Sequence, residues 1–475
     1  MSVANKIFTN TLWQVVIRVI TVVIGVFNLA LITRILGQTG FGFYTTVFAF
    51  VQMFMILADL GLFLTLLREI SAVETRSEES RVVNNIFTIR FFSSLLILLL
   101  VPVVIKFFPY DQIVKDGVVF FVFVFFFQSL MSTLTAVFSK KLDMPKAASV
   151  DLVNRVLYLG SLVYLFKAGG SLNVVLLLHS IVFVISFIIF YFLLKKYVTL
   201  RFAWDFRYWK KVFFRTWPLA ITVVLNLVYF KADTLILSAF HSPEDVGLYG
   251  APYKVLEVLA TFPHMFMSLI LPLFTAAWIS KNLSKLKMLW QHSFDFFSIL
   301  TIGMIVGIWI VNRPLMILLA GKEFAASGAI LNVLVVATAI IFFGTLFTYM
   351  IVALGAQKKM IKYFLFAAII GAIGYFIFIP RYSYWGAAYM TLFIEALIVV
   401  FAYLVARQQL KISLNFKVFN KSLLAGTVAL LSGWAIKEFN LIFAILITGL
   451  VYLTVLYWTK AVDKKLVKEL FNKQT

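Results

Sequence analysis

Long apolar runs separated by short polar connections fill almost the whole chain. A membrane-spanning helix needs about 20 predominantly apolar residues, and glycines, prolines and charges mark where each run ends. These rules predict fourteen spans. They lie near residues 12–34, 41–67, 86–107, 118–138, 150–167, 173–194, 217–240, 250–277, 294–311, 327–354, 361–379, 385–406, 421–436 and 440–459. The pattern therefore predicts an all-α polytopic membrane protein.

The basic residues between the spans predict the orientation of the chain. With the N-terminus inside, the inner segments carry 29 Lys and Arg and the outer loops carry 8. Cytoplasmic loops are enriched in Lys and Arg. We therefore expect a multi-pass protein of the cytoplasmic (inner) membrane, and the even number of spans places both termini in the cytoplasm.

Composition narrows the possible functions. The 475-residue chain is 63% hydrophobic, contains no cysteine and carries a net charge of +22. A soluble protein with that charge would be expected to bind nucleic acid, but here the excess follows the predicted loops and no nucleic-acid partner is expected. Without cysteine there is no disulfide and no thiolate metal site. The first span is followed by no small-residue cleavage pattern, so we interpret it as a retained helix.

A faint internal repeat appears at an offset of 205 residues. Gly42-Phe43-Tyr44 after the first span matches Gly247-Leu248-Tyr249 after the seventh. Duplication of six spans in the same orientation produces such a relation. We predict an N-terminal lobe at 1–200 (spans 1–6) and an interfacial linker with a C-terminal lobe at 201–410 (spans 7–12). The last two spans and a basic cytoplasmic tail occupy 411–475.

The linker between the lobes mixes aromatic and basic residues from Arg201 to Arg215. Such a segment can lie in the headgroup layer, with its rings toward lipid and its cations toward anionic phosphates. An ordinary aromatic belt flanked by topology-determining charges explains the same composition, and the sequence does not separate the two interpretations.

The seventh and eighth spans carry charges where lipid disfavours them: Lys231, Asp233, Lys254 and Glu257. A charge on a membrane helix costs at least about 2.5 kcal/mol and usually faces the protein interior or a water-filled cavity. Lys254 and Glu257 are three residues apart and can neutralise each other, whereas Lys231 and Asp233 point to different faces. A polar transport path and a set of packing salt bridges are therefore both open.

Further charges lie inside predicted spans, among them Arg18, Asp59 and Glu395. Arg90 and the pair formed by Asp151 and Arg155 lie near cytoplasmic ends, where snorkelling or local pairing is sufficient. We expect the cations Arg18, Lys231 and Lys254 to bind an anionic ligand. The acids Asp59, Asp233, Glu257 and Glu395 are the candidates for binding a coupling ion.

The sequence contains no phosphate-binding glycine loop, no zinc-protease motif and no serine-hydrolase motif. We therefore expect no catalytic residues, no metal and no cofactor. Transport would be driven by an ion gradient or by the membrane potential.

Short motifs along the chain resemble the Wzx-type oligosaccharide-lipid flippases. These are the polysaccharide-transporter branch of the multidrug/oligosaccharidyl-lipid/polysaccharide (MOP) exporter superfamily. The matching residues are Arg34–Gly37 with Phe41–Tyr44, Asp59–Leu62, Asp233–Ser238, Val246–Tyr253, Leu319–Ala325, Leu354–Lys358, and Gly386–Ala388 before Glu395. Each motif is short, but their order and topology match over nearly the whole chain.

The resemblance implies two six-helix lobes that form a V-shaped cleft, plus an extra C-terminal pair of helices. Spans 1, 2, 7 and 8 would line the cleft, and alternating access would carry a polyprenyl-diphosphate-linked oligosaccharide outward. Membrane lipids and other polysaccharide-assembly proteins are the further expected partners.

Two alternatives remain at this stage. A multidrug/cation antiporter of the same superfamily would favour an acidic cleft, and the three intramembrane cations count against it. A membrane-embedded polymerase or glycosyltransferase on the same lipid carrier would need a sizeable outer loop with catalytic residues, and the predicted outer loops are short.

Overall fold

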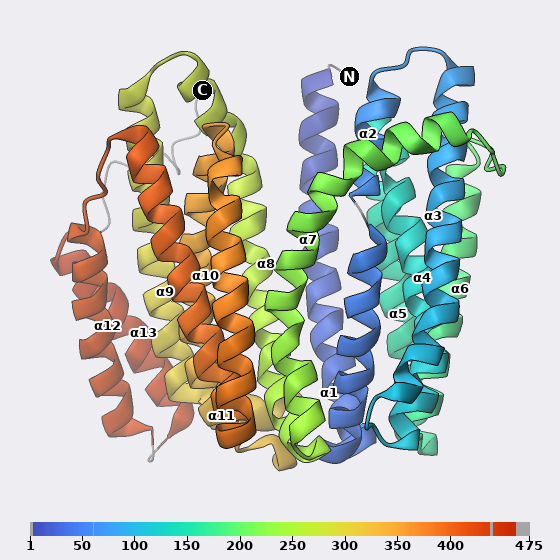
Figure 1. Cartoon of the computed structure of the whole chain (residues 1–475). Coiled ribbons are helices and arrows are strands. Elements are labelled where there is room, and N and C mark those ends of the chain that lie inside the picture. Colours follow the sequence, from blue (N-terminus) through green and yellow to red (C-terminus); the bar gives the residue numbers. More distant parts are fainter. Residues whose placement is uncertain (1–2, 60, 438–439, 462–475) are drawn as a thin grey trace. The chain divides into compact units, whose positions relative to one another are not determined.

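Helices form all the regular elements that the computed structural model describes, which covers the backbone of residues 3–59, 61–437 and 440–461. Short 3-10 helices lie at Ile105–Phe107 (η1), Lys322–Phe324 (η2) and Gln357–Met360 (η3). The long helices in Figure 1 are α1 (Val3–Asp59), α2 (Leu62–Ser71), α3 (Arg76–Val104), α4 (Gln112–Lys140), α5 (Met144–Ala168), α6 (Leu172–Leu194), α7 (Phe206–Phe240), α8 (Pro243–Ile279), α9 (Leu283–Ala320), α10 (Ser327–Ala353), α11 (Ile361–Leu410), α12 (Lys417–Ile436) and α13 (Leu441–Trp458).

Two of these helices contain a sharp break. In α1 the break is at Gly37 (φ 64°, ψ −173°), and in α11 it is at Ser383 (φ 49°, ψ −136°). A continuous helix of 57 residues would be about 86 Å long, far beyond the ~30 Å hydrocarbon core. Each of the two chain segments therefore crosses the membrane twice, and the two parts of α1 run in opposite directions (Figure 1).

This arrangement confirms the predicted number of spans. Among the described residues, ten helices are long and apolar enough to cross a membrane, and the two broken helices are among them. Counting each broken helix twice and adding α7 and α12 gives fourteen spans. The second span has a break that the sequence did not predict, since α1 ends at Asp59 and α2 starts after Gly61, which adopts a left-handed conformation.

Packing divides the chain into two compact units. The first comprises residues 1–250, 319–323 and 375–383, and the second comprises residues 251–318, 324–374 and 384–475. The lobe boundaries predicted at residues 200 and 410 stay a prediction, because the division by packing need not follow a duplication.

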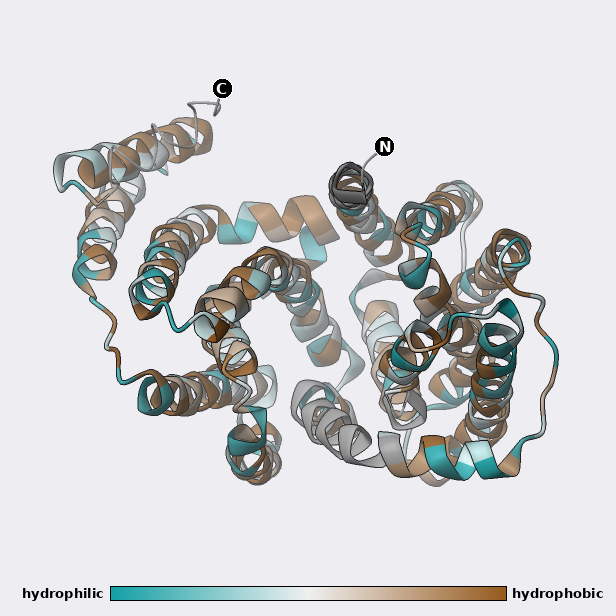
Figure 2. Ribbon diagram, turned by 90° about the horizontal axis from the view of Figure 1, so that it is seen from above, coloured by the Kyte–Doolittle hydropathy of each residue, from teal (hydrophilic) through white to brown (hydrophobic). Residues whose placement is uncertain are grey.

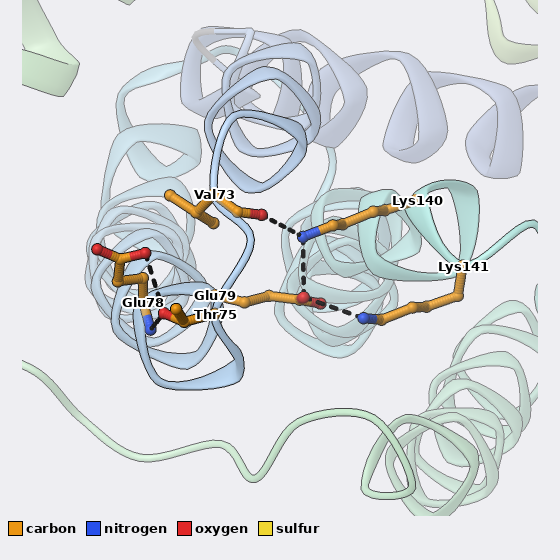
Figure 3. A network of polar contacts seen from close by, with 6 residues as sticks. All are labelled: Val73, Thr75, Glu78, Glu79, Lys140 and Lys141. Atoms are coloured by element: carbon orange, nitrogen blue, oxygen red, sulfur yellow. Dashed lines mark hydrogen bonds and ion pairs between the residues drawn. The ribbon is translucent and has the colours of Figure 1, made fainter.

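The first unit has a hydrophobic core between α2, α3, α4 and α6. Leu66, Ile86, Phe138 and Phe190 are all buried there. At the edge of this core the carboxylate of Glu79, itself buried, accepts hydrogen bonds from Lys140 Nζ at 2.8 Å and Lys141 Nζ at 2.9 Å (Figure 3).

Lys140 Nζ also donates to the carbonyl of Val73 at 3.1 Å (Figure 3). The end of α4 is thereby tied to both the α2–α3 connection and the first turn of α3. A buried carboxylate is tolerated when it is paired and hydrogen-bonded, and Glu79 meets that condition.

The second unit buries a large aromatic cluster that includes Trp290 and Phe297 of α9 and Phe347 of α10. The last two helices pack against α9 over small residues. An added Cβ on Gly426 of α12 would lie 2.6 Å from Ile302, and Tyr452 of α13 donates its hydroxyl to the Ile299 carbonyl at 2.6 Å. Hydrophobic residues predominate along the helices of both units (Figure 2).

The repeated sequence segments meet each other in the first unit. An added Cβ on Gly42 would lie 1.7 Å from the Pro243 carbonyl oxygen, and one on Gly247 would lie 2.3 Å from the Gln38 carbonyl oxygen. Gly42 and Gly247 are 205 residues apart, and so are Gln38 and Pro243. The two contacts are therefore reciprocal, as expected for two copies of one hairpin packed around a local two-fold axis.

Residues related by the same offset also touch directly. The Thr39 hydroxyl donates to the Glu244 carboxylate at 2.5 Å. An added Cβ on Gly250 would lie 2.7 Å from Thr45 Oγ1. Both pairs lie where residues meet their own repeat equivalents, so the faint repeat in the sequence corresponds to a physical interface.

Substitution of either repeat glycine should destabilise the protein. We expect Gly42→Ala and Gly247→Ala each to cost about 1–3 kcal/mol, because the new methyl group meets a backbone carbonyl that has no rotamer to change. Thermal unfolding of the purified protein in detergent measures the effect. Gly160→Ala is the matched control, because its Cβ meets nothing within 4 Å. Equal melting temperatures for all three variants would contradict the close contact.

Candidate functional site

Asp233 lies in the second half of α7 and joins this helix to the beginning of α8. The residue is 1% exposed. Its carboxylate accepts the Tyr249 hydroxyl at 2.6 Å, the Thr234 backbone N–H at 2.6 Å and the Thr234 hydroxyl at 3.2 Å. Three donors satisfy a buried carboxylate, so Asp233 is well held where it lies.

Lys231 lies two residues earlier on α7 and is also buried, at 8% exposure. Its Nζ atom lies 5.8 Å from the centre of the Phe48 ring, a cation–π geometry. Phe48 in turn packs against Phe121 and Phe125 of α4. The first unit thus holds a lysine among phenylalanines, at a depth where a cation is costly and usually functional.

Lys254 and Glu257 lie on one face of α8 in the second unit. Lys254 Nζ is 2.8 Å from Glu257 Oε2, and the two side chains are 23% and 33% exposed. The spacing of three residues predicts this pair, and the structure contains it. The pair leaves both groups partly accessible, so pairing does not by itself exclude a role in binding.

The other three predicted residues are placed differently. The Arg18 side chain on α1 is exposed, whereas Glu395 on α11 is buried at 6% exposure. Asp59 lies outside the residues whose side chains the structure describes. In the first unit Lys231 therefore lies near Asp233, and in the second unit Lys254 forms an ion pair with Glu257. Whether the cations face one common cavity stays a prediction.

Arg155 lies deeper along its helix than the sequence analysis expected. It lies eleven residues into α5, about 16 Å from the start of the helix, and its guanidinium packs on α1. An added Cβ on Gly25 would lie 2.8 Å from Arg155 Nη1, so the guanidinium lies close against α1 at this glycine.

The contacts of Arg155 hold it loosely. Arg155 Nε is 3.7 Å from Asp151 Oδ2, beyond hydrogen-bonding distance, and it is buried without a hydrogen-bond partner. The Arg155 carbonyl accepts a long hydrogen bond of 3.5 Å from Asn28 Nδ2 on α1. The predicted pair with Asp151 exists, but it satisfies the guanidinium incompletely.

In the sequence, the residues that contact Arg155 are a glycine and an asparagine one turn apart on the first span, Gly25 and Asn28. This spacing could not be interpreted from the sequence, because it does not tell which helix packs against the first span.

Two grooves lie elsewhere in the described part of the chain. One, of about 390 Å³, lies at the end of α11 beside Arg407 and Lys411. The other, of about 190 Å³, lies under Trp209 and Phe213 of α7. Neither is lined by any of the seven predicted site residues. Among the described residues there is no group of His, Asp and Glu side chains arranged to hold a metal ion.

Comparison with known structures gives the fold. A multidrug resistance MATE family transporter of the MOP superfamily in an inward-facing conformation matches with a TM-score of 0.70 and 12% identity, over 84% of this chain and 98% of that chain. The lipid II flippase MurJ in an inward closed conformation matches with a TM-score of 0.70 and 15% identity, over 93% of this chain and 97% of that chain.

A MOP superfamily transporter from Pyrococcus furiosus, described as having a binding pocket of reverse polarity, matches with a TM-score of 0.60 and 12% identity. This match covers 86% of this chain and 95% of that chain. At these identities the likeness shows the fold alone. No curated protein matches the sequence.

Comparison with family models identifies the family. The model described as polysaccharide biosynthesis protein matches residues 7–278, which is more than half of the chain. This stretch contains Arg18, Lys231, Lys254 and the repeat glycines of both hairpins. The chain belongs to the polysaccharide biosynthesis protein family and has the all-helical fold of the MOP superfamily transporters.

Proposed function

We propose that the protein is a flippase that moves a polyprenyl-diphosphate-linked oligosaccharide across the cytoplasmic membrane for polysaccharide biosynthesis. Membership of the polysaccharide biosynthesis family supports a substrate from that process. The fold, shared with a lipid II flippase, supports movement of a lipid-linked molecule between leaflets. In this proposal both termini are cytoplasmic and two lobes expose the substrate to each side in turn.

The observation that carries the proposal is the burial of Lys231 in the first unit. A lysine that is 8% exposed and packed on Phe48 is costly in a membrane helix, and such intramembrane cations are usually functional. A diphosphate group suits such a cation, because its oxygens accept strong charge-assisted hydrogen bonds. Arg18 and Lys254 are the further cations of this proposed set, and the loosely held Arg155 joins them.

Coupling to an ion gradient is the second part of the proposal. Asp59, Asp233, Glu257 and Glu395 are the candidate carboxylates. Glu395 is buried at 6% exposure on α11 and lies near the middle of the twelfth predicted span. Asp233 would have to exchange one of its three donors for an ion. Each elementary charge moved across the membrane supplies about 2.3 kcal/mol per 100 mV.

The main alternative is a multidrug/cation antiporter, because a multidrug transporter shares the fold equally well. The buried cation Lys231 disfavours it, since it would repel a cationic drug. An enzyme acting on the same lipid carrier is disfavoured because the family and the fold neighbours are transporters.

Reconstitution into sealed vesicles tests the function. We expect vesicles with the protein to move a fluorescent polyprenyl-diphosphate oligosaccharide between leaflets, measured as protection of the fluorophore from a membrane-impermeant quencher. Lys231→Gln should slow transport by roughly 10- to 100-fold, the equivalent of losing a charged hydrogen bond of about 1.5–3 kcal/mol. Lys231→Arg should retain more activity, because it keeps the charge.

Lys285→Gln is the matched control for this experiment, because Lys285 is an exposed lysine of α9. It should transport at the wild-type rate. Normal transport by Lys231→Gln, at normal protein level, would contradict the proposed ligand role of Lys231. Efflux of a cationic dye without movement of the lipid would support the antiporter instead.

The pair of Lys254 and Glu257 allows a separate test of structure against binding. Each single change to Gln should lower thermal stability by about 1 kcal/mol or less, because the pair is partly exposed. The double change Lys254→Gln/Glu257→Gln should restore stability but not lipid transport, since the diphosphate loses its cation. Recovery of both stability and transport in the double variant would show that the pair is structural only.

A further inference from the structure

The segment Arg201–Phe214, here called the interfacial segment, is fastened to α3 by a ladder of hydrogen bonds. The backbone N–H groups of three alternate residues donate to polar side chains of α3. Arg201 N donates to Asn84 Oδ1 at 3.0 Å, Ala203 N to Thr88 Oγ1 at 2.9 Å and Asp205 N to Asn85 Oδ1 at 3.2 Å. Residues 201–205 form no regular secondary structure, and three of their backbone N–H groups are satisfied by side chains of α3.

An ion pair and a helix cap complete this attachment. Arg81 Nη2 lies 2.7 Å from Asp205 Oδ2, and Asp205 Oδ1 accepts the Tyr208 N–H at 3.0 Å, which caps the start of α7. The hydrogen bond from Arg81 holds the pKa of Asp205 below its usual value. Asp205 is the only acid in the segment, and its charge is already engaged.

The inner face of the first turns of α7 is also satisfied within the protein. Trp209 Nε1 donates to Asn85 Oδ1 at 3.0 Å. Val212 and Thr216 are buried, and they line the 190 Å³ groove together with Leu62 and Ile89. The groove is apolar and lies on the side of α7 that faces α2 and α3. The outer face of the segment is therefore free to meet something else.

That outer face combines large exposed rings with exposed cations. The exposed aromatic residues of this face are Phe206, Phe213 and Phe214. The rings of Phe202 and Trp204 are about half exposed and pack on Phe92 of α3. The exposed cations are Arg201, Arg207, Lys210 and Lys211. Hydrophilic and hydrophobic residues alternate along these turns in Figure 2. In Figure 1 the start of α7 runs across α3 and α2 before the helix turns down beside α1.

Rings and cations on one face match the boundary between headgroups and acyl chains. Phe206 is 68% exposed, which is unfavourable in water but favourable at that boundary. Each Lys or Arg near an anionic leaflet contributes about 1 kcal/mol. The segment also continues directly into the membrane-spanning part of α7, so it has to lie at the level where that helix enters the bilayer.

We propose that the interfacial segment is a binding surface for anionic phospholipid headgroups in the leaflet that contains this end of α7. The four cations bind the phosphates and the exposed rings enter the acyl boundary. The ladder on α3 holds the segment in the membrane plane. Lys231 and Asp233 lie further along the same helix, so the lipid fixes the entry point of the helix that carries them. This inference does not depend on which substrate is moved.

Hydrogen–deuterium exchange in nanodiscs tests the proposal. Nanodiscs of phosphatidylcholine are compared with nanodiscs that also contain phosphatidylglycerol. We expect phosphatidylglycerol to slow exchange in the peptide covering residues 201–216 by at least about fivefold, and high salt to remove the difference. The variant Arg207→Gln/Lys210→Gln/Lys211→Gln should lose the slowing while its ladder to α3 stays intact.

The matched control is Lys358→Gln/Lys359→Gln/Lys362→Gln. It neutralises three exposed lysines, two in η3 and one in the first turn of α11. This variant should keep the full effect of phosphatidylglycerol on residues 201–216. Equal exchange in both lipids would overturn the proposal, and so would slowing that persists in the Arg207/Lys210/Lys211 variant. Loss of the effect in the control as well would mean that total charge, and not this surface, is responsible.

Discussion

The hydrocarbon core of a membrane offers no water, so every buried polar group has to find its partner inside the protein. This constraint explains the helical architecture, and it also explains where the charges lie. Glu79 is shared by two lysines, and Asp233 is surrounded by Tyr249 and Thr234. Charges that are paired in this way hold neighbouring helices together. Lys231 is buried beside the Phe48 ring, and Arg155 is partly exposed with only a long contact to Asp151, so these two cations are the ones we propose for ligand binding.

The same constraint gives the two repeat hairpins their form. A chain that reverses within a membrane protein has to bring two helices together while keeping its backbone groups paired. Gly42 and Gly247 allow the two hairpins to approach until the backbone of each touches the other. The contacts are reciprocal, and the first unit contains both hairpins, the one near Gly42 and its repeat near Gly247.

Much of the fold follows from the sequence, because the length and spacing of apolar runs are local properties. The fourteen spans were predictable, and so was the pairing of Lys254 with Glu257, which depends only on helical spacing. Features that depend on which helices pack together could not be predicted. The packing of Arg155 on Gly25 requires α5 to lie against α1, and the network at Glu79 requires the end of α4 to meet α3. The break at Gly61 was missed because one glycine within an apolar run is a weak signal. For the interfacial segment, the composition showed the mixture of aromatic and basic residues, but it did not predict the hydrogen bonds to α3.

The central claim is that intramembrane cations recognise the diphosphate of a lipid carrier. The most direct test presents one oligosaccharide on two lipids, a polyprenyl diphosphate and an uncharged polyprenyl carrier of the same length. Binding of each to the purified protein is measured by competition with a labelled diphosphate lipid. The account predicts that the diphosphate form competes and that the uncharged form is at least about tenfold weaker, the equivalent of one charged contact of about 1.4 kcal/mol. Equal competition by the two lipids would contradict it.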